Sequence, residues 1–415
     1  MANFKSLGTL LVALVVVVSS GTTLTGCQIL PNLPFLSPTV SPEQLAADDA
    51  RRKHATPGIN SFGFKVFADV ASQSPNENVA LSPTSLGRAL LMVDLGARGS
   101  TQAAIASALG MPDQSSETLG DWVAATKPNL NQSGVSIQVS DSAWIRSNFS
   151  VLPSYLSDLE TYLNAGVGSF RDGRDGTAKI GDWISRVSNG LLDGHGFQLD
   201  DSVMLALADV LTFKGRWDKV FDQSATQQRP FHVSPTQTIT VPMMHQSGDY
   251  LYGESEGYQL IRLPYQRSAY SMYVMLASDS ATVSAPLNVL LFESMIASAS
   301  SHSGEIWLPR FSFDDNTSLT ASLKAIGLAI AFSDGADLSG IAPNLELSDA
   351  WQQIHVKVDE TGTVAAAATE IAMATGAAPV FQKPFSMEVN RPFYFAIRDD
   401  STKAVLFIGR VVNPQ

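Results

Sequence analysis

Cysteine is nearly absent from this sequence, because Cys27 is the only one among 415 residues. A chain with one cysteine forms no internal disulfide. The six histidines show no HxH or HxxxH spacing, and no second cysteine stands beside them, so a zinc site is not expected. Neither a metal nor a cofactor is predicted.

Clusters of positive charge are also missing. The longest run of Lys and Arg is Arg51, Arg52 and Lys53, and the formal net charge is −12. Phosphate binding needs a clustered cationic face, so nucleic acid is not an expected partner. With 45% hydrophobic residues, the chain still has ample material for a large core, which argues against disorder.

Motifs of common enzyme classes are absent as well. There is no G-x-S-x-G elbow and no Walker loop. Residues Gly96–Gly99 are glycine-rich but lack the phosphate-loop pattern, and we interpret them as a turn that ends a helix. Asp172–Gly176 has too few spaced oxygens for a calcium loop and is interpreted as a solvated turn. The motifs therefore give no support for an enzyme.

The first 26 residues have the organisation of an export signal. Lys5 precedes an unbroken apolar run from Leu10 to Val18, and a small, polar stretch ends in the sequence LTGC at Cys27. Nine apolar residues are too few for a mature membrane span, which favours a cleaved signal peptide over 1–26 rather than part of the folded structure. The tetrapeptide resembles the bacterial lipobox, whose cysteine is lipidated and becomes the new N-terminus. A buried thiol beside an ordinary secretory signal is the alternative.

Residues 27–58 follow with five of the 21 prolines and little periodic apolar signal. This composition predicts a Pro-rich tether that holds a globular domain off a membrane. Gln28, rather than Asp, after the cysteine favours the outer membrane of a bacterial cell envelope over the inner one, and an extracellular protein is the other possibility. Removal of 1–26 deletes only the charge of Lys5 and leaves −13.

The body, residues 59–415, shows helical periodicity mainly in its first half and strand patterns mainly in its second. Helices are expected over Ile59–Val70, Leu81–Leu95 (with Ser82 as cap and Pro83 in the first turn), Thr101–Leu109, Ala178–Leu192 and Ser318–Gly327. Strands are expected over Val135–Trp144, Val203–Phe213 and several stretches between Phe231 and Leu276. The run Val203–Phe213 is apolar almost throughout, as in a strand buried on both faces. We find no internal repeat or linker, which predicts one α+β domain.

A long segment of small residues follows the strand-like Ile354–Val358. It begins DETGTVAAAAT at Asp359, and from Thr363 to Lys383 only Glu370 and Lys383 are charged. As a strand, residues 363–376 would place uncharged side chains on one face and Glu370 on the other. A slip of one residue would bury that carboxylate at a cost of several kcal/mol, so the register is specified. Because alanine is a poor strand former, an Ala-rich helix or a flexible loop is the alternative.

Several stretches, in family order, resemble the serpins, the serine protease inhibitor superfamily. They are LSPTSLGRAL (81–90), LGARGST (95–101), FKGRW (213–217), VPMMHQSGDY (241–250), AFSDGADLSGI (331–341) and RPFYFAIRDDSTKAVLFIGRVVNP (391–414). The resemblance extends over 59–415. It implies a serpin fold of three β-sheets and about eight or nine helices, with an exposed reactive-centre loop.

The resemblance also implies a suicide mechanism. A target serine protease attacks the loop and forms a covalent acyl-enzyme, and the cleaved loop then inserts into the large central sheet and carries the protease with it. Inhibitory members keep the loop hinge small, whereas non-inhibitory members often place charged or bulky residues or proline there. The positions that match the hinge are Glu360, Gly362, Thr363, Ala365, Ala366, Ala367 and Ala368. The hinge residues of this sequence match the pattern of the inhibitory members.

The usual spacing from Glu360 in the family places the reactive bond at Gly376-Ala377, with Thr375-Gly376 and Ala377-Ala378 as alternatives. Each option offers a small, uncharged residue to the primary pocket of the protease. Trypsin-like enzymes, which need Arg or Lys, are therefore disfavoured, and elastase-like or subtilisin-like proteases are expected.

Two further regions of the family match residues in the body. The breach corresponds to Trp217, with Arg310 placed to pair with Glu360. The shutter corresponds to Ser82 and Ser85, together with Asp209 and Gln352, where most members have Asn and His. Because a carboxylate accepts a hydrogen bond from an amide, we expect a substituted but satisfied Asp209–Gln352 contact. The alternative is that these two residues have separate partners.

The leading expectation is thus an inhibitory serpin, monomeric, anchored to a membrane through lipid on Cys27. A serpin-fold binding or carrier protein of the cell envelope that no longer inhibits is the alternative. A solute-binding envelope lipoprotein has no support from the body sequence.

Overall fold

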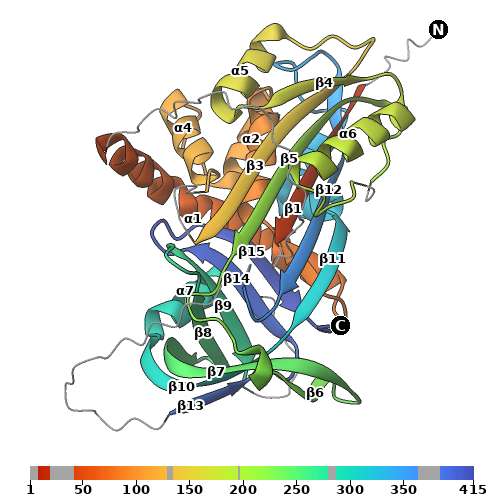
Figure 1. The fold of residues 1–415 in the computed structure, drawn as a ribbon. Coiled ribbons are helices and arrows are strands. Elements are labelled where there is room, and N and C mark those ends of the chain that lie inside the picture. Colours follow the sequence, from red (N-terminus) through yellow and green to blue (C-terminus); the bar gives the residue numbers. More distant parts are fainter. Residues whose placement is uncertain (1–7, 19–41, 129–133, 195–196, 279–286, 363–383) are drawn as a thin grey trace, which may run out of the picture.

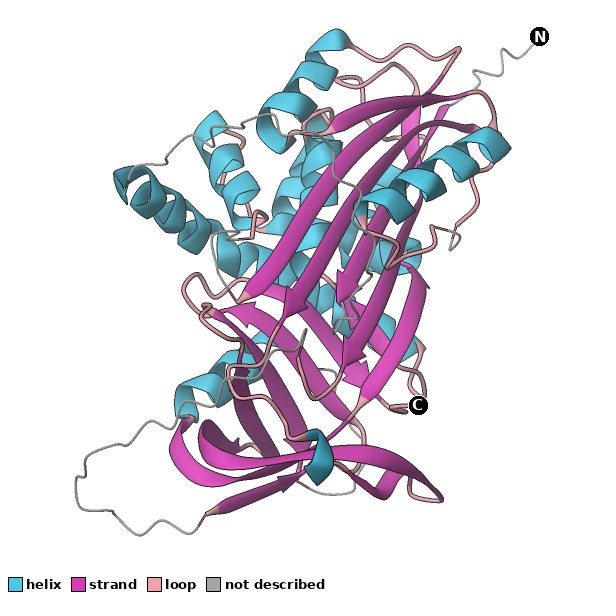
Figure 2. Ribbon diagram, in the orientation of Figure 1, coloured by secondary structure: helices cyan, strands magenta, loops and turns pink. Residues whose placement is uncertain are grey.

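The computed structural model describes residues 8–18, 42–128, 134–194, 197–278, 287–362 and 384–415, with backbone alone for 8–18 and 42–46. The helices α1 to α8 span Pro42–Gln73, Pro83–Asp94, Gly99–Leu109, Ser116–Ala125, Pro153–Leu163, Gly173–Val187, Val289–Ser298 and Thr320–Leu323. Most of them gather around one large sheet, whereas α7 lies at the opposite end of the molecule, which is built mainly of strands (Figures 1 and 2).

The large sheet has six strands in the order β11-β12-β1-β5-β3-β4. Their bounds are Phe311–Ser318 (β11), Leu345–Val358 (β12), Gly8–Val18 (β1), Val203–Gly215 (β5), Val135–Arg146 (β3) and Gly166–Phe170 (β4). Strands β5 and β12 each run parallel to β1, whereas β3 and β11 are antiparallel to their neighbours β5 and β12. The centre of this sheet is therefore a block of three parallel strands.

Strand β5 is buried on both faces, as its apolar run predicts. Ala206 and Ala208 belong to a core cluster with Ile180 and Ile184 of α6, whereas Leu205 joins the core that includes α1 and α2. Because successive side chains of a strand alternate between faces, helices cover both sides of the sheet here.

The remaining strands form one continuous hydrogen-bonded array in which β7 belongs to two sheets. Residues of β7 (Gln237–Ser255) pair with β6 (Gln227–Ser234) and β10 (Ser300–Pro309) along most of their length and with β8 (Tyr258–Pro264) at the end. One sheet comprises β6, β7, β10 and β13 (Phe385–Glu388), and the other continues from β8 through β9 (Tyr270–Ala277), β14 (Phe393–Asp399), β15 (Val405–Val411) and β2 (Val79–Leu81). Together with the large sheet they give the three sheets expected from the sequence.

Helix α1 corrects the expected boundary of the tether. It begins at Pro42, so residues 42–58 are helical rather than part of a linker. Pro57 lies inside the helix, where it lacks an N–H to donate, and this proline suggested a tether. Tertiary packing compensates for it, since Ala55 is fully buried and His54 Nδ1 lies 2.8 Å from Asp121 of α4.

Strand β1 differs from the expectation that residues 1–26 lie outside the folded structure. The apolar run Leu10–Val18 forms a strand between β5 and β12, with Leu14 opposite both Asp209 and Gln352. A signal peptide and a central strand both require an unbroken apolar run, and valine is favoured in strands, so composition alone does not separate the two. The export role of 1–26 stays a prediction. Among the described helices, none is long and apolar enough to cross a membrane.

Candidate functional site

The residues that match the start of the hinge form a tight turn at the end of β12. Gly362 donates its N–H to the Asp359 carbonyl at 3.2 Å, and the N–H of Thr361 bonds to the Asp359 carboxylate at 3.0 Å. Gly362 has φ 67°, and a Cβ there would lie 2.3 Å from the backbone nitrogen of Trp217. Because only glycine fits both that conformation and that space, the chain can turn sharply away from β12 at this residue.

Trp217 contacts this turn through its side chain and its backbone. Its indole Nε1 donates to the Asp359 carbonyl at 2.9 Å, and its backbone N–H faces the Thr361 carbonyl at 3.4 Å. The ring is 2% exposed and stacks on Tyr265 with a centroid distance of 4.7 Å. The end of β12 is thus fixed to a rigid aromatic pair.

Glu360 and Arg310, expected as partners at the breach, lie together. Arg310 Nη2 is 2.5 Å from Glu360 Oε1, and Thr226 Oγ1 donates to the same oxygen at 2.6 Å. Burial alone would raise the pKa of Glu360, but the hydrogen bonds from Arg310 and Thr226 outweigh it and hold the pKa below its usual range. Glu360 therefore remains charged within a nearly closed site.

Arg310→Ala is expected to loosen this turn. The substitution leaves a mostly buried carboxylate with one neutral donor, which costs about 1–3 kcal/mol of unfolding free energy. Because the folded pKa of Glu360 lies below its ordinary value of 4.5, the loss of unfolding free energy caused by Arg310→Ala should reach its full size above pH 4.5. It should vanish as pH falls through the folded pKa. Urea unfolding from pH 3 to 7 measures the change in stability, and the rate of loop insertion measures the effect of the loosened turn.

Lys357→Ala is the matched control, because Lys357 lies 4.0 Å from Asp359 in the same turn and 34% of its side chain is exposed. A pair of this kind contributes about 1 kcal/mol or less. If Arg310→Ala changed neither stability nor insertion rate, the ion pair would have no role.

The shutter residues surround a buried charge cluster beneath the sheet. Ser82 caps α2 by accepting from the Ser85 N–H at 3.2 Å, and the Ser85 hydroxyl donates to Asp209 Oδ1. Arg88 donates through Nε to Asp141 at 2.8 Å, and its Nε lies 3.8 Å from Asp209 Oδ2. Two carboxyl groups thus share one guanidinium.

Asp209 is fully buried within this cluster. Burial raises the pKa of the Asp209 carboxyl well above its usual range, the negative charge of Asp141 raises it further, and Arg88 only partly opposes these effects. A carboxyl kept neutral in this way resembles an asparagine amide in size and charge.

Asp209→Asn is therefore expected to remove a pH dependence rather than to disrupt the shutter. Because the folded pKa of Asp209 lies above its ordinary value of 3.8, the neutral carboxyl contributes its full stability below pH 3.8 and loses it as pH rises toward the folded pKa. Across this pH window, the unfolding free energy of the variant should rise relative to that of wild type by up to about 1.4 kcal/mol per pH unit. Urea unfolding from pH 4 to 8 tests this, and parallel profiles for the two proteins would contradict it.

The expected contact between Asp209 and Gln352 is wrong for this structure. Strand β1 lies between their strands, so Leu14 is the register partner of each. Both amide atoms of Gln352 are buried and lack a hydrogen-bond partner in the described part of the chain, as does Asp209 Oδ2. Buried polar atoms without a hydrogen-bond partner cost stability, so neither residue is fully satisfied in the arrangement that contains β1.

The other predicted positions lie outside the described residues. These are Cys27 and the loop residues Thr363, Ala365, Ala366, Ala367, Ala368, Gly376 and Ala377. The structure describes the turn that leads into the loop and β13, which follows it. Within the described ranges no cluster of His, Cys, Asp and Glu could hold a metal ion.

Sequence reasoning missed several residues that the site depends on. Thr226 and Tyr265 contact the breach from distant segments, and Arg88 with Asp141 completes the charge cluster at the shutter. Arg88 lies one helical turn after Ser85, and this spacing on a predicted buried helix was the available signal. Thr226 and Asp141 carried no local signal, because their partners are far away in sequence.

Comparison with known proteins identifies relatives over almost the whole body. The family model described as Serpin (serine protease inhibitor) matches residues 57–414. A serine protease inhibitor of Cyanea capillata is 30% identical over 371 residues, which cover 86% of this chain and 97% of the relative.

Two solved structures share the fold. Mouse protein Z-dependent protease inhibitor has a TM-score of 0.76 at 26% identity, covering 88% of this chain and 100% of that one. Human thyroxine-binding globulin has a TM-score of 0.77 at 23% identity with the same coverage, and at that identity the likeness concerns the fold alone.

Proposed function

This chain belongs to the serpin family, and from that premise we propose that it inhibits serine proteases by suicide-substrate trapping, with the reactive bond at Gly376-Ala377. The observation that carries the proposal is the turn at Asp359–Gly362. It lies at the end of β12, beside the middle of the large sheet, and is followed by the small, uncharged hinge from Thr363 to Ala368.

In the proposed reaction the protease serine attacks the Gly376 carbonyl. An ester bond to Gly376 forms, the peptide bond to Ala377 breaks, and the released amine takes a proton. The segment that ends at Gly376 is still joined to β12 through Gly362. Because it leaves β12 through a reversing turn, it would pair with β12 in the antiparallel direction, with Glu360 and Trp217 as the fixed pivot.

The small residues around the reactive bond support an elastase-like or subtilisin-like target. A direct test incubates residues 27–415 with pancreatic elastase, subtilisin and trypsin. Complexes that survive denaturing electrophoresis are expected with the first two, and mass spectrometry should locate the cut at or within one residue of Gly376. Cleavage there without a stable complex or a gain in thermal stability would exclude inhibition.

That last outcome would favour a non-inhibitory binding or carrier protein. One observation gives this alternative weight: β1 already occupies the position between β5 and β12 that an inserted loop would need. A chain that retained β1 in this position would be cleaved as an ordinary substrate.

We further propose that the protein is a monomer held at a bacterial envelope, with the outer membrane favoured, through lipid on Cys27. Cys27→Ala is expected to abolish incorporation of labelled palmitate in cells and to move the protein from the membrane fraction to the soluble fraction. Ser20→Ala, within the same export segment, serves as the control and should leave both unchanged. Palmitate incorporation that persists in Cys27→Ala would refute the anchor.

A further inference from the structure

The buried charge cluster at the shutter contains more acid than base. Arg88 donates to Asp141 Oδ2 through Nη2 at 2.5 Å and through Nε at 2.8 Å, and its Nη2 also donates to the Leu163 carbonyl at 2.8 Å. Asp209 has the Ser85 hydroxyl and a guanidinium nitrogen that lies 3.8 Å away. The side chains of Arg88, Asp141 and Asp209 are at most 4% exposed, so bulk water does not solvate the second carboxyl group.

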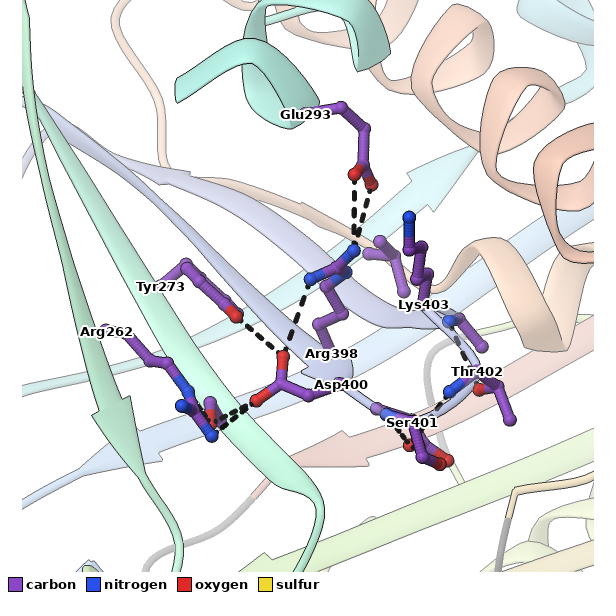
Figure 3. Close-up of polar contacts among 12 residues, drawn as sticks. Arg262, Tyr273, Glu293, Arg398, Asp400, Ser401, Thr402 and Lys403 are labelled. Carbon is purple, nitrogen blue, oxygen red and sulfur yellow. Dashed lines mark hydrogen bonds and ion pairs between the residues drawn. The ribbon is translucent and has the colours of Figure 1, made fainter. Parts of the chain in front are cut away.

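A partly buried cluster between α7 and β14 shows a balanced arrangement of the same groups. Arg262 and Arg398 face Asp400 and Glu293, and Asp400 also accepts from the Tyr273 hydroxyl at 2.6 Å (Figure 3). Arg262 lies 2.7 Å from Asp400, and Arg398 lies 3.2 and 3.4 Å from the two carboxylate oxygens of Glu293. Each carboxylate there has a guanidinium of its own, whereas one guanidinium serves two carboxyl groups at the shutter.

Two oxygens of the shutter cluster are placed to share a proton. Asp141 and Asp209 lie directly opposite each other on β3 and β5. Asp141 Oδ1 and Asp209 Oδ2 are buried and have no hydrogen-bond partner among the described residues. A proton held between them would give each oxygen a partner and would remove the excess charge. Burial and the charge of Asp141 both raise the pKa of Asp209, which favours that proton.

Arg88 of α2 and Asp141 of β3 are the charged groups that act on Asp209 in the described part of the chain. Three more charged residues lie around the cluster: Lys127 after α4, and Asp48 and Arg52 of α1. Within the described ranges, none of these three forms an ion pair with Asp141 or Asp209. The protonation of Asp209 therefore depends mainly on its two nearest charged neighbours.

The polar neighbour of Asp209 on β12 depends on the number of strands in the sheet. In the six-stranded sheet, Leu14 of β1 lies opposite both Asp209 and Gln352, and both amide atoms of Gln352 lack a partner among the described residues. Without β1, β5 and β12 become neighbours, and the same register brings Gln352 to Asp209. An amide N–H that donates to a carboxylate stabilises its charged form. A charge on Asp209 is therefore more stable in the five-stranded sheet than in the six-stranded one.

We propose that expansion of the large sheet from five strands to six takes up one proton from solvent at Asp209. In the five-stranded sheet Asp209 is charged and accepts from Gln352, and in the six-stranded sheet it is neutral and shares its proton with Asp141. Arg88 is a positioning residue, because it holds Asp141 beside Asp209 and joins β3 to α2 and to the end of α5.

A lower pH then favours the six-stranded sheet. Between the lower pKa of Asp209 in the five-stranded sheet and its higher pKa in the six-stranded sheet, the equilibrium shifts by up to about tenfold per pH unit. The consequence for trapping rests on the proposed function, since the inserted loop would take the place of β1 as the sixth strand. Insertion should compete better with release of the protease as pH falls.

Infrared spectroscopy tests the proton without any protease. At pH 6 the difference spectrum between residues 1–415 and their Asp209→Asn variant should contain the band of a protonated carboxyl group. Burial raises the pKa of Asp94 to about 7, but Asp94 is present in both proteins and cancels. The same difference for uncleaved residues 27–415 should contain the bands of a charged carboxylate. The same protonation state in both lengths of chain would overturn the proposal.

Two variants of residues 1–415 should move the pH at which the protonated band disappears, in opposite directions and by about one unit or more. Asp141→Asn should lower it, because Arg88 then serves Asp209 alone, and Arg88→Met should raise it. Tyr155→Phe removes a buried hydrogen bond of 2.9 Å to the Met92 carbonyl in the same contact between α2 and α5, without a change of charge, and should leave it unmoved. An unmoved band in Asp141→Asn, or an equal shift in Tyr155→Phe, would contradict the proposal.

The ratio of trapped to cleaved protein tests the link to inhibition. For residues 27–415 with elastase, this ratio should fall at least fivefold from pH 6 to pH 8, relative to the ratio for Asp209→Asn, which reports the pH dependence of the protease itself. Parallel ratios for the two proteins would overturn the link. If wild type formed no complex at either pH, the proposed function would fail, and the infrared spectra would still decide whether Asp209 takes up the proton.

Discussion

Ala365→Arg is expected to convert the protein from an inhibitor into a substrate. In the register that buries the uncharged face of the loop, Ala365 would point into the sheet between β5 and β12. Burying a guanidinium there without a partner costs several kcal/mol, so insertion should become slower than release of the protease. Stable complex should fall at least tenfold while the rate of cleavage stays unchanged, as measured by gel densitometry and product analysis.

Ala366→Arg is the matched control. It introduces the same side chain one residue later, on the face that carries Glu370, where the guanidinium would remain hydrated. This variant should trap the protease nearly as well as wild type. Equal losses in the two variants would mean that the alternation of faces does not govern insertion.

Retention of residues 1–26 is expected to have a comparably large effect. Strand β1 pairs with β5 on one side and β12 on the other, so a chain that keeps it has no free sheet position for the loop. We expect at least tenfold less complex with elastase from residues 1–415 than from residues 27–415, with cleavage preserved. Parallel reactions at equal protein concentration measure the difference.

Val15→Pro in the longer chain separates strand pairing from other effects of the extra residues. Val15 lies opposite Val210 and Gln353, and proline is excluded from central strands because it lacks an N–H. This variant should recover complex formation, whereas Val15→Ile should not. If residues 1–415 without substitution trapped elastase as well as residues 27–415 did, β1 would not compete with the loop.

Elements with strong local signals could be predicted closely from the sequence. The apolar run at Val203 became β5, the alternation at Val135 became β3, and Ser82-Pro83 began α2. Gly110 ends α3 with φ 70°, as a glycine after a helix should. In each case the local preference and the tertiary packing favour the same structure.

Elements that depend on distant contacts could not be predicted. The start of α6 depends on Asp201, whose carboxylate accepts from the Gly173 N–H at 2.8 Å, whereas the neighbouring residues suggested a solvated turn. Helix α1 meets α4 through His54 and Asp121, and the place of β1 depends on two strands that follow much later in the chain. The composition of a segment limits the secondary structures that it can form, and its tertiary contacts select one of them.

The candidate site shows the same division. The breach residues come together as family position implied, because the turn at Asp359–Gly362 and Trp217 are fixed by backbone contacts. The shutter differs because a third strand separates Asp209 from Gln352. The predicted contact considered only these two residues and could not take a strand between them into account.

The position of β1 also has a consequence for the order of events during synthesis. Its segment leaves the ribosome first, but its partner β12 ends at Val358, near the end of the chain. At about 5–20 residues per second, translation from Val18 to Val358 takes roughly 20 to 70 s. Throughout that time half of the strand's site does not yet exist, and any export machinery meets an unpaired apolar peptide. The same residues can therefore act as an export signal during synthesis. They can form a strand of the sheet only if the export machinery does not recognise them.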